Sequence, residues 1–517
     1  MTDFSNTLAT YYHERTKYDP DTIASKGRGI DWSKQPVPFK EYKIGQTLDL
    51  KPYLSQESKS KTDSETVFWR RLSQLLYCSY GITAKMATMM GPPIYLRAAP
   101  SAGGLYPAEV YLLSRGTPLL PAGLYNYQPQ THALVQFWEK DVWATLRQAC
   151  FFHPALEETN LAIATSTVYY RSAWRYEDRA YRRIFLDTGH LLGNIELAGA
   201  VNGFRPCLIG GFQDKLMNQL LYLNEEEEGV MTVIPLLDVG EKSPQLPPNL
   251  EQNSQYFTAL PSGLAQDYPD IADGELLGAL QKATEIESSK PLPSPSPQEA
   301  KMGTEDKYNF PFCLKVSMYS SPIDWKEDLA DLEQTILKRR STRAYTGADL
   351  TLEELQALLH FTYQPQDYTV QGLDPAPDYF DLSLVETFVA VSGVVGLEEG
   401  CYYYAPKDQE LRQIRFKNFR RELHYLCLGQ DLGRDAGAVI FHTADLKGAI
   451  AKYGDRVYRY LHMDAGHLGQ RLNLAAIHLG LGVSGIGGFF DDQVNEVLGI
   501  PKDEAVIYIS TLGRPRQ

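Results

Sequence analysis

Paired cysteine motifs, basic clusters and long apolar runs are all missing from this sequence of 517 residues. The six cysteines are scattered and none forms a C-x-x-C spacing, which argues against a zinc site or a disulfide framework. No stretch approaches the roughly 18 apolar residues that a membrane-spanning helix needs. The formal net charge is −14 and no Lys/Arg-rich block stands out, so neither nucleic acid nor a membrane is expected as a partner.

The start of the chain has no basic segment followed by an apolar core, so it does not resemble a secretory signal peptide. Together with scattered cysteines, this favours a cytoplasmic protein. Apolar residues make up 43% of the chain and charged residues 22%, as in folded globular proteins, and the length requires two or more domains.

An internal repeat accounts for the length. Residues 175–221 align with residues 452–498 at an offset of 277 without a gap. From Tyr176 to Leu221, 19 of 46 positions are identical, where composition alone would give roughly three. The two halves are therefore expected to share one fold.

The boundary between the halves is marked by residues 243–255 and 288–307, which are rich in proline, serine and charge and indicate a linker. We expect a leader at residues 1–60, half one at 61–240, a linker at 241–310 with a short helix at 273–286, and half two at 311–517.

Helical and strand patterns are mixed within each half, which predicts an α+β fold. Residues 350–363 have apolar side chains at helical spacing, with Thr351 as the N-cap and Glu354 completing a capping box. Residues 464–482 are apolar nearly all round, which is typical of a helix buried between two halves. Strands are expected at residues 108–114, 386–392 and 505–511.

Two segments carry residue types that suit a phosphate or a flat ligand. Arg339, Arg340 and Arg343 surround Ser341, and guanidinium groups with a hydroxyl can wrap a phosphate, although a solvated helix end would look similar. The segment 100–104, P-S-A-G-G, brings bare backbone to the start of a strand, which fits either close approach of a ligand or a plain turn.

Three further patterns recur or suggest ligands. I-G-G-F occurs in both halves, so Gly487 and Gly488 either present N–H groups to a ligand or form a shared turn. The D-x-G-H pattern at 187–190 and 464–467 is interpreted as buried structural histidines, because no further carboxylates complete a metal site. Residues 480–485 match G-x-G-x-x-G but follow a helix, which excludes a dinucleotide fingerprint.

Lys452 and Tyr453 stand where half one has Arg175 and Tyr176. A lysine in a partly buried aromatic setting can act as a general base, whereas an arginine stays protonated. Half two therefore has a candidate for proton transfer that half one lacks.

Four motifs together resemble the nitroreductase superfamily of FMN enzymes. They are R-R-S-T-R-A-Y at 339–345, P-S-A-G-G-L-Y-P at 100–107, the segment that begins K-Y-G-D-R at 452–467, and G-I-G-G-F-F-D-D at 485–492. The most similar branch is that of the SagB-type dehydrogenases, which includes the azoline oxidases of thiazole- and oxazole-forming peptide pathways. The resemblance implies an α+β homodimer with two FMN sites at its interface, here replaced by two tandem domains that form an intramolecular pseudo-dimer.

The halves depart from this family pattern in complementary ways. Half two has the arginine motif, but P-D-Y-F-D at 377–381 replaces P-S-A-G-G, whereas half one has P-S-A-G-G and no arginine motif. We therefore expect one composite FMN site to survive and its mirror image to have decayed.

The resemblance also implies roles for individual residues. The phosphate and ring edge are assigned to Arg339, Arg340, Ser341, Arg343, Arg514 and Arg516, the backbone contact to Pro100, Ser101, Ala102 and Gly103, and N–H groups near the reactive nitrogen to Gly487 and Gly488. Lys452 and Tyr453 resemble the Lys-Tyr pair with which azoline oxidases abstract a proton. The sequence leaves open which of the two sites holds this pair.

Three functions are consistent with these features. The first is an FMN-dependent oxidoreductase of SagB type that moves a hydride between FMN and a small or peptide-derived, azoline-like substrate. The second is an NAD(P)H-dependent nitro or quinone reductase, which needs no special base. The third is a non-catalytic flavin-binding or scaffold protein. No metal is expected, and a fused pseudo-dimer is expected to act as a monomer.

Overall fold

Each half of the chain folds around a seven-stranded sheet, and the two sheets have the same strand order. The computed structural model describes residues 6–26, 29–55, 62–87, 93–240, 258–287 and 305–516. The order is β1-β6-β5-β4-β7-β9-β8 in half one and β10-β15-β14-β12-β16-β18-β17 in half two, with every neighbouring pair antiparallel. The predicted duplication and α+β fold are confirmed.

The strands of half one are β1 (Gln46–Asp49), β2 (Ile82–Met86), β3 (Ile94–Arg97), β4 (Ala108–Ser114), β5 (Gly123–Gln128), β6 (Ala133–Trp138), β7 (Leu161–Val168), β8 (Phe204–Pro206) and β9 (Glu228–Asp238). Those of half two are β10 (Lys315–Ser317), β11 (Leu350–Thr351), β12 (Glu386–Val391), β13 (Val394–Val395), β14 (Gly400–Ala405), β15 (Glu410–Arg415), β16 (Ala438–Asp445), β17 (Gly482–Ile486) and β18 (Glu504–Gly513). The three predicted strands correspond to β4, β12 and β18.

The α-helices up to the linker are α1 (Leu8–Arg15), α2 (Ile23–Lys26), α4 (Ser64–Tyr80), α5 (Trp143–Ala149), α6 (Tyr169–Tyr176), α7 (Ala180–Val201), α8 (Asp214–Leu220) and α10 (Leu276–Ala283). Half two has α12 (Ala330–Lys338), α13 (Leu352–Tyr363), α14 (Arg420–Leu426), α15 (Asp431–Arg434), α16 (Leu446–Tyr453), α17 (Val457–His478) and α18 (Asp491–Leu498). The predicted capping box of Thr351 and Glu354 opens α13, and the predicted linker helix is α10.

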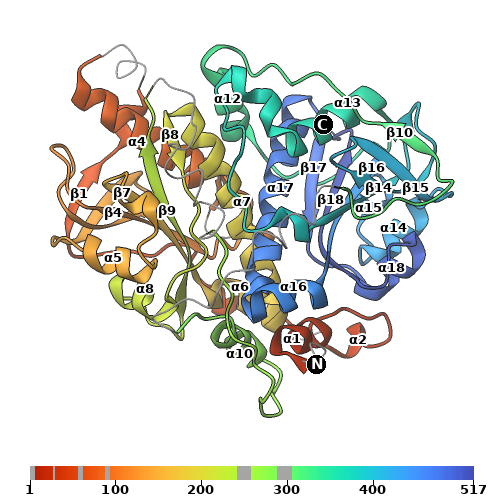
Figure 1. Ribbon diagram of the computed structural model, residues 1–517, viewed down its shortest axis with the longest axis horizontal. Helices are drawn as coiled ribbons and strands as arrows, with labels where there is room; N and C mark the ends of the chain where they lie inside the picture. The colour runs from red at the N-terminus through yellow and green to blue at the C-terminus, as the bar shows by residue number, and fades with distance from the viewer. Residues whose placement is uncertain are drawn as a thin grey trace.

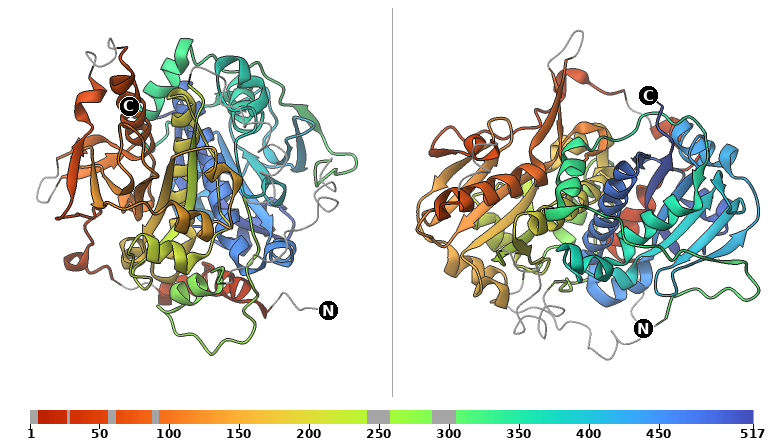
Figure 2. Two further views of the ribbon diagram at one scale, coloured as in Figure 1. Left: turned by 60° about the vertical axis from the view of Figure 1, so that its left-hand side comes forward. Right: turned by 90° about the horizontal axis from the view of Figure 1, so that it is seen from above.

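The halves meet along α7 and α17, which lie side by side between the two sheets (Figures 1 and 2). A Cβ built at Gly189 would lie 2.1 Å from the carbonyl oxygen of Met463, and one at Gly466 would lie 2.4 Å from that of Leu186. Since each glycine meets the backbone of the opposite helix, the two helices cross in direct contact. The prediction of a helix buried between the halves is confirmed.

Polar side chains from both long helices are hydrogen-bonded to each other within this interface. His190 bonds Gln470 at 2.9 Å and Tyr508 at 2.8 Å, and His467 bonds Glu196 at 3.2 Å. Burial lowers the pKa of His190 to about 3, which keeps its ring neutral. Both histidines are therefore structural, as predicted, and no group of metal ligands occurs among the described residues.

The leader, which the sequence leaves unassigned, belongs to both halves. β1 pairs with β6 at the edge of the first sheet, and α1 lies against the second half. The amide of Ala9 donates to Asp455 at 2.9 Å, and Arg182 donates to the carbonyl of His13 at 2.7 Å. The leader thus joins elements that are far apart in the chain.

Two other expectations can be compared with the structure. The cysteines are free, as predicted, and no helix in the described ranges is long and apolar enough to cross a membrane. Most of residues 243–255 and 288–307, predicted as linker, lie outside the described part of the chain.

Replacing Gly189 with alanine should destabilise the protein because a Cβ at the helix crossing forces two backbones apart. We expect the free energy of unfolding to fall by about 2 kcal/mol or more in urea titrations. Gly278→Ala is the matched control, since that helical glycine in α10 is exposed and has no atom within 4 Å of its built Cβ. The free energy of unfolding of this control should rise by roughly 0.5–1 kcal/mol, because alanine has a higher helix propensity than glycine. Equal effects of the two variants would contradict a tight crossing.

Candidate functional site

The P-S-A-G-G turn leads into β4 and is held by one carboxylate of α7. Ser101 Oγ donates to Asp187 at 2.6 Å, and the amide of Ala102 donates to it at 3.0 Å. Gly103 and Gly104 both have a φ of +66°, a conformation that side chains disfavour, and a Cβ built on Gly104 would have no atom within 4 Å. The two glycines can thus adopt the backbone conformation of the turn, and the space next to Gly104 is open.

Asp187 and its counterpart Asp464 support equivalent turns in the two halves. Burial raises the pKa of Asp187 to about 7, opposed by the hydrogen bonds from Ser101 and Ala102 and by the charge of Arg183. Burial likewise raises the pKa of Asp464 to about 8, although it accepts the amides of Phe380 and Asp381, each at 2.9 Å. Both halves thus keep the aspartate that accepts the amides of the turn, whereas the turn itself is P-S-A-G-G in half one and P-D-Y-F-D in half two.

The I-G-G-F turns differ in the same way between the halves. In half one the amide of Gly210 donates to the carbonyl of Thr258 at 2.8 Å, and a Cβ built there would lie 2.1 Å from the ring of Phe380. In half two, Gly487 and Gly488 have no acceptor for their amides among the described residues. The linker residue Thr258 and Phe380 therefore cover Gly210, whereas the amide of its counterpart Gly487 stays without an acceptor in the described part of the chain.

These differences define two pseudo-sites related by the internal repeat. The uncovered pseudo-site consists of Ser101–Gly104, Arg175, Tyr176, Arg183, Gly487 and Gly488. The covered pseudo-site consists of Gly210, Gly211, Leu260, Phe380, Lys452 and Tyr453. At the covered pseudo-site, the Phe380 ring stacks on Tyr460 with 4.6 Å between centroids, and a Cβ on Gly211 would lie 2.4 Å from Leu260.

Lys452 and Tyr453, the predicted proton-transfer pair, lie at the covered pseudo-site. Lys452 Nζ forms an ion pair with Asp381 at 2.6 Å, and the Tyr453 hydroxyl donates to the same carboxylate at 3.1 Å. The carbonyl of Tyr453 also accepts the amide of the linker residue Ser262 at 3.0 Å. Their catalytic role remains a prediction, and it would require a substrate where linker and Phe380 now lie.

The uncovered pseudo-site has Arg175 and Tyr176 in the corresponding positions. The Tyr176 hydroxyl lies 2.8 Å from a Cβ built on Gly103, and the Arg183 guanidinium lies 3.9 Å from the centre of the Tyr176 ring. Burial raises the pKa of Tyr176, while the charges of Arg183 and Arg175 oppose this shift. The phenol is therefore protonated at neutral pH. The repeat pairs Tyr176 with Tyr453, but only the structure shows which of them lies beside the glycine turn.

The arginine motif lies next to the uncovered pseudo-site. Arg339 donates to the carbonyls of Ala98 at 2.7 Å and Arg97 at 3.2 Å, just before the glycine turn. Its Nη1 is buried without a partner in the described residues. The amide of Thr342 donates to Val483 in β17 at 2.9 Å. The motif thus connects the P-S-A-G-G turn with the strand that leads to Gly487.

Of the remaining residues predicted to bind phosphate, some already form hydrogen bonds or ion pairs with the protein and others form none within the described residues. Arg340 donates to Thr83 in β2 at 2.9 and 3.0 Å, and Arg514 forms two bonds with Glu354 at 2.7 and 2.8 Å. Ser341 and Arg343 have no hydrogen-bond or ion-pair partner among the described residues. Arg516 is exposed, and its amide donates to the carbonyl of Ala344 at 3.0 Å.

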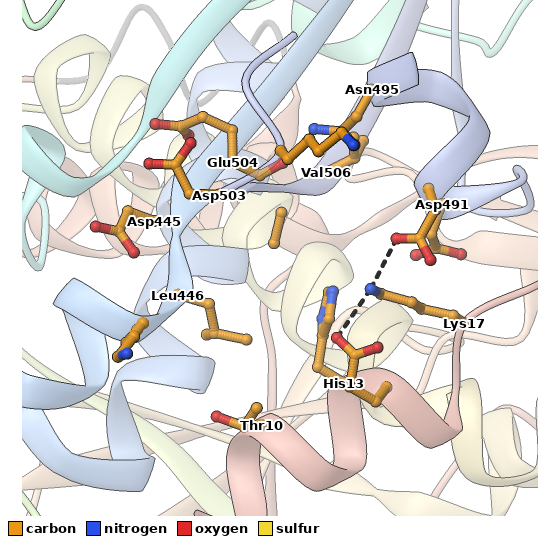
Figure 3. A pocket seen from close by; sticks show the side chains of 15 residues that line it. Thr10, His13, Lys17, Asp445, Leu446, Asp491, Asn495, Asp503, Glu504 and Val506 are labelled. Atoms are coloured by element: carbon orange, nitrogen blue, oxygen red, sulfur yellow. Dashed lines mark hydrogen bonds and ion pairs between the residues drawn. The ribbon is translucent and has the colours of Figure 1, made fainter. Parts of the chain in front are cut away.

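The two larger cavities given by the described residues lie away from the predicted site residues. A cavity of 430 Å³ has His13, Asp445 and Glu504 in its lining, and Figure 3 shows Lys17 at its side, with the side chain directed toward the start of α18. Lys17 forms an ion pair with Asp492 at 2.8 Å. A second cavity of 760 Å³ follows the linker around α10. Neither contains a predicted site residue.

Comparison with known proteins identifies relatives of both halves. The model of the Nitroreductase family matches residues 71–236 and 336–514. A crystal structure from Anabaena variabilis ATCC 29413, described as a nitroreductase, is 66% identical, covers 99% of this chain and 100% of its own, and superposes with a TM-score of 0.91.

Two curated relatives match shorter stretches. A nitroreductase homologue of Methanocaldococcus jannaschii is 36% identical over 169 residues, which are 33% of this chain and 84% of the relative. The microcin B17-processing protein McbC of Escherichia coli is 27% identical over 146 residues, which are 27% of this chain and 52% of McbC.

Replacing Glu177 with glycine should stabilise the chain. Glu177 follows Tyr176 and has a φ of +48°, where the repeat has Gly454 at +68°. A non-glycine residue in this region costs roughly 1–3 kcal/mol, so we expect a gain of about 1 kcal/mol in the free energy of unfolding. The paired control is Gly454→Ala, which should be destabilising because its Cβ would lie 2.2 Å from the carbonyl of Ser262. A loss of stability in Glu177→Gly would contradict strain at this position.

Proposed function

The chain belongs to the nitroreductase family, and on that premise we propose that it is an FMN-dependent reductase with one flavin site, at the uncovered pseudo-site. Family membership makes the chain an oxidoreductase, because the family model matches both halves. The observation that carries the proposal is a contrast between two amides: that of Gly487 has no acceptor among the described residues, whereas that of Gly210 is bonded to the linker.

The uncovered pseudo-site has the polar groups that FMN requires. Unpaired N–H groups at Gly487 and Gly488 suit the acceptor edge of a flavin ring, and the orphaned Nη1 of Arg339 offers one more buried donor. Ser341 and Arg343, both unpaired in the described part of the chain, suit a phosphate. FMN, when bound, would supply the ability to take up a hydride and pass it on.

The proposal divides the predicted FMN ligands into two groups. Ser341, Arg343 and Arg516 would hold the phosphate, and Ser101–Gly103 would contact the flavin through backbone atoms. Arg340 and Arg514 would act indirectly, since their guanidinium groups are already bonded to Thr83 and Glu354. They would keep the phosphate-binding segment in place.

Tyr176 supports reduction of the substrate rather than its dehydrogenation. A protonated phenol can donate a proton to a substrate that receives a hydride, whereas dehydrogenation needs a group that takes a proton away. Arg175 cannot supply such a base because it stays protonated. We therefore propose NAD(P)H as the hydride donor, and a nitro or quinone compound as the acceptor class.

A SagB-type dehydrogenase is the second candidate, favoured by the similarity to McbC. It would need a proton acceptor, and Lys452 lies with Asp381 at the covered pseudo-site. The two candidates therefore place the essential proton-transfer residue in different halves of the chain.

We expect about one FMN per chain when the purified protein is denatured and the released flavin is quantified. Replacing both Ser341 and Arg343 with alanine removes a hydroxyl and a charge, and should weaken FMN binding by roughly 10- to 100-fold. Lys338→Ala is the control, because this neighbouring cation is exposed and bonds Gln334. Two FMN per chain, or none after adding free FMN, would contradict a single composite site.

Tyr176→Phe should slow reduction of the acceptor by about 100-fold, since general acid catalysis is typically worth that much or more. Stopped-flow absorbance should show that flavin reduction by NAD(P)H is much less affected. The same substitution at Tyr453 is the control and should leave both steps unchanged. If Tyr453→Phe or Lys452→Met abolished turnover while Tyr176→Phe did not, the dehydrogenase candidate would replace the reductase.

A further inference from the structure

The uncovered pseudo-site contains a buried arginine that forms no ion pair with a carboxylate of the described residues, although its charge opposes the rise in the pKa of nearby Asp187. Arg183 in α7 is 5% exposed, and its one hydrogen bond within the described residues is to the carbonyl of Arg179, at 3.4 Å. No ion pair to it is formed in that part of the chain. A buried guanidinium without a counterion is costly, so its position requires an explanation.

Neighbouring arginines at the starts of α7 and α17 show the usual arrangement. Arg179 and Arg182 share Asp491 at 2.8 and 2.6 Å, and Arg456 and Arg459 share Asp214 at 2.6 and 2.8 Å. The chain thus supplies a carboxylate for four buried arginines around the helix crossing. Arg183 directly follows Arg182, but it forms no ion pair with a carboxylate in the described part of the chain.

Arg175 adds a second unpaired cation next to the glycine turn. Its side chain is exposed, and Nη1 lies 3.4 Å from a Cβ built on Gly103. Arg183 Nε lies 3.3 Å from a Cβ built on Gly487. The centre of the Tyr176 ring lies 3.9 Å from the guanidinium carbon of Arg183 and 5.6 Å from that of Arg175. Two guanidinium groups therefore lie close to the proposed proton donor.

The covered pseudo-site, where the linker occupies the place of a ligand, shows which residues the repeat has at the positions of Arg175 and Arg183. Arg183 corresponds to Tyr460, whose hydroxyl donates to the carbonyl of Leu260 at 2.9 Å. Arg175 corresponds to Lys452, which is neutralised by Asp381 at 2.6 Å. Where the linker lies in the site, the chain thus has a neutral side chain and a paired cation. At the uncovered pseudo-site, by contrast, Arg175 and Arg183 are both cations and neither forms an ion pair within the described residues.

We propose that Arg175 and Arg183 form an anion subsite beside Tyr176, and that the acceptor reduced here carries a carboxylate. This inference rests on the proposed function, since it places the acceptor on the side of Tyr176. Guanidinium groups bind carboxylates through paired hydrogen bonds, which would hold the reducible group near the phenol. The phosphates of NAD(P)H and the FMN whose site adjoins Arg183 are the other sources of negative charge, and the test with FMN-saturated protein separates them from the acceptor.

The test uses two nitro compounds of the same shape and different charge, 4-nitrobenzoate and 4-nitrobenzamide. Reduction is balanced as R–NO₂ + NADPH + H⁺ → R–NO + NADP⁺ + H₂O, with the hydride from NADPH and the proton from solvent through Tyr176. Binding to the full-length protein, saturated with FMN, is measured by calorimetry, and turnover is measured separately.

We expect nitrobenzoate to bind about tenfold more tightly than nitrobenzamide. Arg175→Gln should remove most of this preference and leave binding of nitrobenzamide unchanged. Arg183→Lys retains the buried charge and should keep part of the preference, whereas Arg183→Gln should lose it. Lys282→Gln is the control, because this exposed cation in α10 belongs to neither pseudo-site, and it should bind both compounds like the unaltered protein.

Three results would overturn the inference. One is equal binding of the two nitro compounds, and another is an unchanged preference in Arg175→Gln and Arg183→Gln. The third is a loss of NADPH affinity in these variants without any change for nitrobenzoate, which would assign the arginines to the dinucleotide phosphates. FMN released from each variant is measured in parallel. Absent flavin in the unaltered protein would count against the proposed function, whereas full flavin content in every variant with no anion preference would count against this subsite alone.

Discussion

The direct contact of α7 with α17 at Gly189 and Gly466 determines the geometry of both pseudo-sites. Asp187 lies two residues before the first glycine, and Asp464 two residues before the second. Each carboxylate holds a turn of its own half by its backbone amides. The distance between the helices therefore sets where each turn lies relative to the other half. A composite site built from both halves requires this contact to be rigid.

Fusion of the two halves removes the reason for the two sites to be alike. In a symmetric dimer each substitution appears at both sites, whereas in one chain each half can change alone. Here Phe380 and the linker contribute an aromatic ring and Leu260 to one pseudo-site, where burial of apolar surface is stabilising. Asp381 provides the counter-charge for Lys452. The covered side thus contributes stability, and the uncovered side retains unpaired polar groups.

Much of the fold follows from local sequence signals. The capping box at Thr351, the apolar strand β4 and the long helix α17 depend on residue spacing, and all three were predictable. The position of Lys452 was not, because a repeat aligns it with Arg175 without showing which glycine turn it adjoins. Arg514 illustrates the same limit. Its position in the motif suggested a phosphate ligand, but Glu354, from a helix start more than a hundred residues earlier, holds it by two bonds.

The charge pattern around Tyr176 links the proton donor to the kind of substrate. Burial disfavours the phenolate, whereas two nearby guanidinium groups favour it, so the arginines bring the hydroxyl closer to releasing its proton. An anionic group bound between those arginines would neutralise part of their charge and shift the balance back toward the protonated phenol. Because the pKa of Tyr176 is raised even beside the free arginines, the phenol holds its proton at neutral pH in either case, and the bound carboxylate would serve to place the reducible group next to it. A neutral compound would leave the arginine charges uncompensated, and so would lose this binding contact.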